Sequence, residues 1–162
     1  MFNSSDLLFV PLGGSGEIGM NANLYHYQGS WLMVDLGISF PDDSMPGIDV
    51  VLPDLSFIES RRDALAGLVL THGHEDHLGA IPYMWSQLGC PVYGSAFTLA
   101  LLRRKLAENG KQTDIPLIEI GPGSVTEIGA FSVEMVGLAH SIPDPTALAI
   151  RCEAGTVLHT GD

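Results

Sequence analysis

The sequence predicts a layered α/β fold, and three features of its apolar pattern support this prediction. Short apolar runs separated by glycine and proline open and close the chain, as expected for strands joined by turns. Between them, apolar residues recur at helical spacing in two segments, which alternate with short strand-like runs. This order indicates helices packed on a sheet that is built largely from hairpins.

The first third of the chain is predicted to form strands and a loop. The apolar run at 7–12 ends in glycines, and the runs at 23–27 and 31–35 flank a Gln-Gly-Ser turn, which predicts a hairpin. Proline and aspartate are frequent at 40–53, which indicates a loop, and a short helix is expected over 54–62.

The middle of the chain is expected to alternate strands with helices. A buried strand is predicted at 67–71, and helical spacing predicts helices over 78–88 and 95–109, the second with Ser95 as its N-cap. Six further strands are predicted, at 90–93, 116–120, 125–128, 131–138, 147–152 and 156–159.

Composition limits the classes of protein to consider. A chain of 162 residues is about one domain, and 46% hydrophobic residues with 16% charged residues argue against disorder. The net charge of −12 argues against nucleic-acid binding through bulk positive charge. The basic clusters Arg61-Arg62 and Arg103-Arg104-Lys105 are interpreted as solvated helix faces.

No segment is interpreted as a targeting signal or a membrane span. Residues 1–6 lack the basic start of a signal peptide. The uncharged stretch 78–102 is as long as a spanning helix, but glycines and prolines interrupt it, so buried elements of a soluble fold are expected. Cys90 and Cys152 lie far apart in the sequence, which fits a reducing compartment. We therefore expect a cytoplasmic protein with no membrane partner.

Three of the six histidines lie within six residues, at His72, His74 and His77. Imidazole is the commonest nitrogen ligand of transition metals, and the cluster follows an apolar strand, where α/β sheets usually carry their sites. In a tight turn, residues 72 and 74 can point one way, while Asp76 and His77 point at an adjacent spot. The spacing therefore predicts two divalent ions that share a bridging water.

The H-x-H-x-D-H segment that starts at His72 resembles the signature of the metallo-β-lactamase superfamily, whose fold is a four-layer αββα sandwich with a dinuclear site at one edge. By this resemblance Asp35 supports the site, His140 is a ligand and Asp162 bridges both metals. One metal is then held by His72, His74 and His140, and the other by Asp76 and His77, with Asp162 between them.

Longer segments resemble the ribonuclease J family, namely LGGSGEIGMN at 12–21, THGHEDHLGAIP at 71–82 and HSIPD at 140–144. That family consists of RNA hydrolases that combine 5′-exonuclease and endonuclease action. Its metallo-β-lactamase domain is interrupted by a β-CASP domain, and a C-terminal domain follows. The resemblance covers the chain from Leu8 to Asp162 and implies RNA as the substrate.

The implied chemistry is hydrolysis of a phosphodiester by a metal-activated hydroxide. Asp76 and Asp162 are expected to orient the bridging water as well as bind metal. Imidazole-rich ligation suits Zn²⁺, and the carboxylates leave Mn²⁺ as an alternative. Ser141 is a candidate contact for the substrate phosphate, with local backbone bonding as the alternative.

Asp162, the implied bridging ligand, is the last residue. A protein of the ribonuclease J type would continue into more sheet, a β-CASP domain and a later histidine ligand. We therefore expect residues 1–162 to be the N-terminal portion of a metallo-β-lactamase domain that is inactive on RNA by itself, with the β-CASP and C-terminal domains outside this chain. Homo-oligomers are expected for the full-length protein.

Other interpretations compete with these. The segment 14–19 fits the GxGxxG dinucleotide fingerprint, but 20–29 is too short and turn-rich for the helix that this motif needs. A tight turn or a backbone-lined wall beside the metals is expected instead. His26 and His159 are expected to be structural or supporting residues. The alternative functions are hydrolysis of a small thioester or lactone, or metal binding without catalysis.

Overall fold

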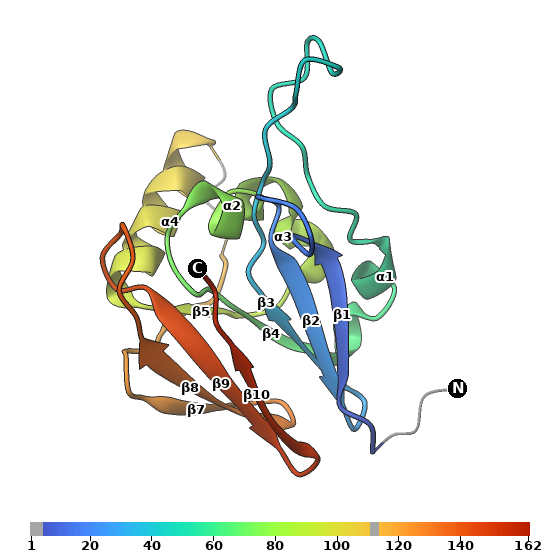
Figure 1. The fold of residues 1–162 in the computed structure, drawn as a ribbon, viewed down its shortest axis with the longest axis vertical. Helices are drawn as coiled ribbons and strands as arrows, with labels where there is room; N and C mark the ends of the chain where they lie inside the picture. The colour runs from blue at the N-terminus through green and yellow to red at the C-terminus, as the bar shows by residue number, and fades with distance from the viewer. Residues whose placement is uncertain (1–4, 111–113) are drawn as a thin grey trace.

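The computed structural model describes residues 5–110 and 114–162, so the first four residues of the polar start lie outside the described part. Two β-sheets face each other, and the helices cover the outer face of the larger one (Figure 1). The predicted α/β layered class is confirmed, and the described residues supply three layers of the expected sandwich: helices, sheet and sheet.

The larger sheet has six strands in the order β1-β2-β3-β4-β5-β6. Its first three strands are antiparallel, whereas β3 to β6 run parallel, so the polypeptide leaves β3, β4 and β5 at the same edge. The strands are β1 (Leu8–Gly13), β2 (Ala22–Tyr27), β3 (Ser30–Val34), β4 (Leu65–Val69), β5 (Val92–Gly94) and β6 (Leu117–Glu119).

The smaller sheet is antiparallel, with the order β10-β9-β8-β7. Its strands are β7 (Val125–Ile128), β8 (Phe131–Gly137), β9 (Thr146–Cys152) and β10 (Gly155–His159). Strand β10 lies at its edge, and the chain ends beyond it in the space near α2 (Figure 1).

The helices are α1 (Ser56–Glu59), a 3₁₀ turn η1 (Arg62–Ala64), α2 (Glu75–Leu78), α3 (Ile81–Leu88) and α4 (Ala96–Glu108). The prediction of one helix over 78–88 is wrong at its start, because the helix breaks at Gly79 and Ala80. The Ala80 amide donates to the carbonyl of Leu36 in a tertiary contact. The expected N-cap is confirmed: the Ser95 hydroxyl accepts from the Thr98 amide at 3.2 Å.

Two buried apolar clusters hold the layers together. One lies between the helices and the six-stranded sheet and includes Leu68, Leu99 and Leu102. The other lies between the two sheets and is centred on Phe131 and Leu148. Each large apolar side chain buried in this way contributes about 1.5–3 kcal/mol. The clusters therefore fix both sheets relative to the loops at the edge where the histidines lie.

Within the described part of the chain, no helix is both long enough and apolar enough to cross a membrane. The uncharged stretch at 78–102 is instead divided among the last residue of α2, α3, β5 and part of α4.

Candidate metal centre

The predicted ligands gather at one edge of the sheets, although they come from distant parts of the chain. Asp35 directly follows β3, His72 lies three residues beyond β4, and His140 follows β8. Asp162 follows β10 and reaches the same place, with its carboxylate 3.3 Å from His77 Nε2. The carboxyl ends of parallel strands meet at one sheet edge, which explains why β3 and β4 deliver their residues together.

Three imidazoles converge on one point. His72 Nε2 lies 3.0 Å from His74 Nδ1, and His140 Nε2 lies 3.2 Å from the same atom. His72 is buried, whereas His140 is partly open to solvent. The three histidines assigned to one metal by their motifs therefore form a single group.

A second group shares His72 with the first. It contains His72, His77 and Asp162, whose ligand atoms all lie within 4.8 Å of one another. Asp76 belongs to neither group, and its Oδ2 lies at the rim, 3.5 Å from His77 Nε2. The structure thus brings all six predicted ligands to one place but sets Asp76 slightly apart.

The carboxylate of Asp35 organises the buried side of the centre. It accepts hydrogen bonds from the Thr71 amide and the Thr71 hydroxyl, both at 2.8 Å, and its Oδ2 lies 2.8 Å from His77 Nδ1. Asp35 is fully buried and has a φ of 61°, a left-handed conformation that aspartate tolerates better than most residues. These contacts tie Asp35 to Thr71 and His77, and its supporting role at the site stays a prediction.

Burial and charge shift the pKa values of these groups in different directions. Burial alone would lower the pKa of His77, but the Asp35 carboxylate, together with the charges of Asp76 and Asp162, outweighs burial and raises that pKa to about 9. Burial alone would raise the pKa of Asp35, but the charge and hydrogen bond of His77 lower it. Burial and the neighbouring His77 lower the pKa of His72 to about 4. His72 is therefore a neutral imidazole at neutral pH.

The residues fit a metal of the kind that imidazole prefers. The Thr71 hydroxyl donates to Asp35 and so accepts from His72 Nδ1, which leaves the Nε2 lone pair of His72 facing the other rings. Two nitrogens bound to one Zn²⁺ at about 2.0–2.1 Å lie about 3.3 Å apart in a tetrahedral site. The separations of 3.0 and 3.2 Å between the ring nitrogens are close to that value.

The loop that carries the glycine motif at 14–19 leads to Asn21, which contacts the candidate ligand segment. The Asn21 amide donates to the carbonyl of Asp76 at 3.0 Å, and its side-chain Nδ2 lies 3.2 Å from His77 Nε2. Gly37 donates to the Asn21 carbonyl and passes so close to Asp76 that a Cβ would overlap its carbonyl. Residues 22–27 form strand β2, so the helix of a dinucleotide fingerprint does not follow this loop.

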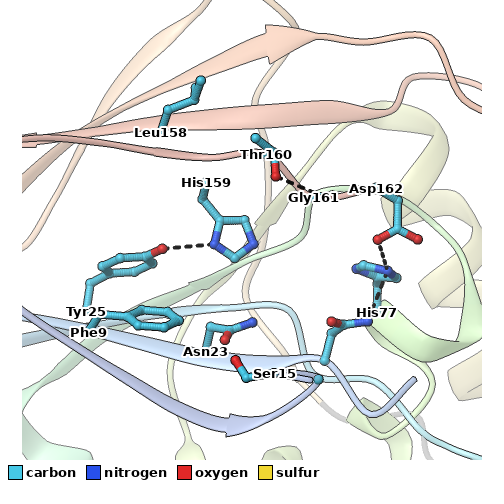
Figure 2. Close-up of a pocket in the computed structure, with 12 residues that line it drawn as sticks. Phe9, Ser15, Asn23, Tyr25, His77, Leu158, His159, Thr160, Gly161 and Asp162 are labelled. Atoms are coloured by element: carbon cyan, nitrogen blue, oxygen red, sulfur yellow. Dashed lines mark hydrogen bonds and ion pairs between the residues drawn. The ribbon is translucent and has the colours of Figure 1, made fainter. Parts of the chain in front are cut away.

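A pocket of about 270 Å³ opens beside His77 and Asp162 (Figure 2). Tyr25 and His159 form one wall, where the Tyr25 hydroxyl lies 2.9 Å from His159 Nδ1. Burial raises the pKa of Tyr25 to about 12 and lowers the pKa of His159, so both groups are neutral near pH 7. Among the described residues, His159 joins neither ligand group.

The remaining candidate residues lie as follows. Ser141 is exposed beside His140. His26 packs against Trp31 with ring centroids 4.6 Å apart. Arg103 and Arg104 are exposed, as predicted, but the interpretation of Lys105 as solvated is wrong. Its side chain is 23% exposed, and its Nζ lies 2.7 Å from a carboxylate oxygen of Glu75.

Residues 16–162 match the family model of the metallo-beta-lactamase superfamily. The chain is also similar to proteins named Ribonuclease J. The match is 47% identical for Sinorhizobium meliloti, covering 100% of this chain and 29% of that protein. The protein from Mycobacterium tuberculosis is 44% identical, over 98% of this chain and 28% of that protein. The protein from Helicobacter pylori is 38% identical, over 99% of this chain and 23% of that protein. The chain thus spans less than a third of the length of these relatives.

Two solved structures share the fold. The metallo-beta-lactamase fold protein YhfI from Bacillus subtilis matches with a TM-score of 0.66 and 18% identity, over 95% of this chain and 61% of that one. A protein of unknown function from Enterococcus faecalis matches with a TM-score of 0.67 and 22% identity, over 96% of this chain and 43% of that one. At these identities the likeness supports the layered fold alone.

Proposed function

Since the chain belongs to the metallo-β-lactamase superfamily, we propose that it is the metal-binding N-terminal portion of a metal-dependent ribonuclease of the ribonuclease J type. The observation that carries this proposal is the convergence of His72, His74 and His140 next to His77 and Asp162. The 38–47% identity to proteins named Ribonuclease J supports the choice of RNA as substrate.

The proposed metal ligands are His72, His74 and His140 for one ion, and Asp76 and His77 for a second, with Asp162 between them. Divalent ions held there would lower the pKa of bound water and offset the charge of a phosphodiester. Zn²⁺ suits this imidazole-rich set of ligands, and the carboxylates leave Mn²⁺ as an alternative.

The chain's own residues prepare this site for hydrolysis. Asp35 holds the His77 ring so that Nε2 faces Asp162 and Asp76. Asp76 and Asp162 are the proposed catalytic carboxylates, which would orient the attacking water through hydrogen bonds. Ser141 stands exposed beside His140 and would contact a substrate phosphate.

The proposal extends to the whole protein. We infer that β-CASP and C-terminal domains complete the enzyme, that the RNA-binding surface lies mostly there, and that the full-length protein forms homo-oligomers in the cytoplasm. A charge of −12 agrees with an RNA-binding surface supplied elsewhere.

Activity assays with and without a chelator test the proposal. The full-length protein should hydrolyse 5′-monophosphorylated RNA with Zn²⁺ or Mn²⁺ and lose this activity in EDTA. The 162-residue chain should bind the metal without efficient cleavage. Hydrolysis of thioesters or lactones without action on RNA would refute the ribonuclease assignment, and efficient RNA cleavage by the chain alone would refute the view that further domains are needed.

A further inference from the structure

Glu75 stands inside the candidate metal-binding segment, yet its side chain does not join the ligands. It lies between His74 and Asp76 in sequence, but among the described residues it belongs to neither ligand group. Its Oε2 instead lies 2.7 Å from Nζ of Lys105, a residue of helix α4. The ion pair therefore links the ligand segment to a different element of the fold.

The surroundings distinguish this ion pair from ordinary surface pairs. The Lys105 side chain is 23% exposed and that of Glu75 is 47% exposed. By contrast, the pair between Arg104 and Glu108, on the same helix, is 78% and 59% exposed. Removing the partner of a partly buried lysine costs more free energy than removing the partner of an exposed one, because the remaining charge is poorly solvated.

Helix α4 is a firm anchor for such a link. It has 13 residues, is capped by Ser95 and buries Leu99, Leu102 and Leu106 in the core. The helix also lies close to the ligand segment at a second point, since a Cβ added at Gly73 would lie 2.6 Å from Leu101 Cδ1. The helix thus approaches the segment at Gly73 and is paired with it at Glu75.

The backbone around Glu75 sets the direction of the ligands that follow it. Glu75 opens α2, and its carbonyl accepts from the amides of Ile38 and Gly79. Asp76 and His77 project from the same short turn. A movement of Glu75 relative to helix α4 would therefore move the Asp76 and His77 side chains relative to His72.

We propose that Glu75 and Lys105 are positioning residues, whose ion pair fixes the segment 72–77 on helix α4 and so sets the metal affinity of the site. The proposal rests on the proposed metal centre. It concerns how the ligands are held and is independent of which substrate is hydrolysed.

Metal titration of the 162-residue chain tests it, with Co²⁺ as a spectroscopic probe and Zn²⁺ in competition. Glu75→Gln and Lys105→Met should each weaken binding by roughly 10-fold, the lower end of the loss caused by removing a hydrogen bond to a ligand, because the pair acts on the ligands through the backbone. Each variant should also change the visible Co²⁺ spectrum. Lys105→Arg keeps the charge and should retain most of the affinity. The matched controls Glu108→Gln and Arg104→Met break the exposed pair and should bind as the parent chain does.

A double-mutant cycle shows whether Glu75 and Lys105 affect metal binding through their ion pair or independently of each other. If the residues act through each other, Glu75→Gln with Lys105→Met should bind no more weakly than either single variant. Metal-free circular dichroism and thermal unfolding would show whether each variant is folded.

Unchanged affinity and spectrum in folded Glu75→Gln and Lys105→Met would overturn the proposal, as would additive losses in the double variant. A parent chain that binds neither Co²⁺ nor Zn²⁺ would refute a metal centre formed by the ligands of this chain alone. Normal metal binding with no RNA hydrolysis by the full-length protein would count against the proposed function and leave the positioning role intact.

Discussion

The Asp35 carboxylate and the His77 imidazole form a buried pair, with Oδ2 of Asp35 2.8 Å from Nδ1 of His77. The His77 side chain is 2% exposed and that of Asp35 is fully buried. Because Asp35 holds one nitrogen, the other nitrogen of the ring faces Asp162 at 3.3 Å. One carboxylate thus decides which atom of His77 is presented to the candidate metal site.

Substitution of Asp35 should destabilise the metal-free chain. Asp35→Ala leaves His77 without its partner and places alanine at a φ of 61°, so we expect a loss of about 3–5 kcal/mol. Asp35→Asn should lose less, because asparagine tolerates this φ and can still accept from the Thr71 amide. Urea unfolding in EDTA measures both.

The matched control for these variants is Asp144→Asn. Asp144 also has a positive φ, of 54°, but it is exposed. Its substitution should change the free energy of unfolding by less than about 0.5 kcal/mol. Equal losses in Asp35→Asn and Asp144→Asn would show that the buried pair with His77 does not account for the effect.

The stability of the metal-free chain should fall in alkaline solution. The pKa of His77 is raised from 6.5 to about 9 in the folded chain, so protonated His77 stabilises the fold. This contribution, roughly 3 kcal/mol, is complete below pH 6.5 and is lost as the pH rises through about 9. Urea midpoints measured across this range should decline, and Asp35→Asn should flatten the curve.

The lowered pKa of Asp35 has the opposite consequence in acid. Its contribution is present above the ordinary aspartate pKa of about 4 and is lost as the pH falls through the lower value in the folded chain. In the alkaline range, by contrast, a free energy of unfolding that rises steadily from pH 6.5 to 9 would contradict the pairing of Asp35 with His77.

Metal binding should release a proton from His77. At about pH 8 this residue is still mostly protonated in the metal-free chain, and it must lose a proton to act as a ligand, whereas His72 is already neutral. Calorimetric titration in two buffers of different ionisation enthalpy counts the protons. Asp35→Asn should release fewer protons at the same pH, because its His77 has lost the foremost of the three carboxylates that raise the pKa. Equal release by the two chains would be inconsistent with this account.

Part of the candidate site was predictable from the residues themselves, because the proposed ligands at 72–77 follow a local pattern. The spacing of His72, His74 and His77 places donors on a single turn, and this pattern is visible without any tertiary contact. His140 and Asp162 lie far away in sequence and could be identified through a family resemblance alone. The structure adds that His72 is close to both groups of donors.

The contacts that hold the ligands were not predictable, because they join elements that are distant in sequence. Lys105 was interpreted as part of a solvated basic face, since no periodicity shows that Glu75 lies opposite it. The break between α2 and α3 was also missed. It depends on the tertiary hydrogen bond from Ala80 to Leu36, and the apolar spacing continues across it.

His140 and His159 should differ in their effect on metal binding. His140→Ala removes a nitrogen from the three-histidine group and should lower Co²⁺ affinity by more than about 100-fold, beyond the usual effect of an outer-shell change. His159→Ala breaks the contact with Tyr25 and should change affinity by less than about 10-fold. Similar large losses in both variants would identify His159 as a ligand and refute the proposed set.

Gly37→Ala should damage the site without removing any ligand. The segment 36–38 pairs with 75–77 through two backbone hydrogen bonds, from Leu36 to His77 at 2.7 Å and from Ile38 to Glu75 at 3.1 Å. A Cβ at position 37 would overlap the Asp76 carbonyl, so the two segments must separate. We expect a loss of about 1–3 kcal/mol in the free energy of unfolding, as for other overpacked sites, together with weaker metal binding.

The control for Gly37→Ala is Gly121→Ala, where no described atom lies within 4 Å of the added Cβ. This variant should stay within about 0.5 kcal/mol of the parent chain and bind Co²⁺ with the same spectrum. If Gly37→Ala also retained the parent spectrum and affinity, the close approach of these segments would be unimportant to the ligands. A loss confined to position 37 would instead show that the metal centre depends on a contact for which glycine alone leaves room.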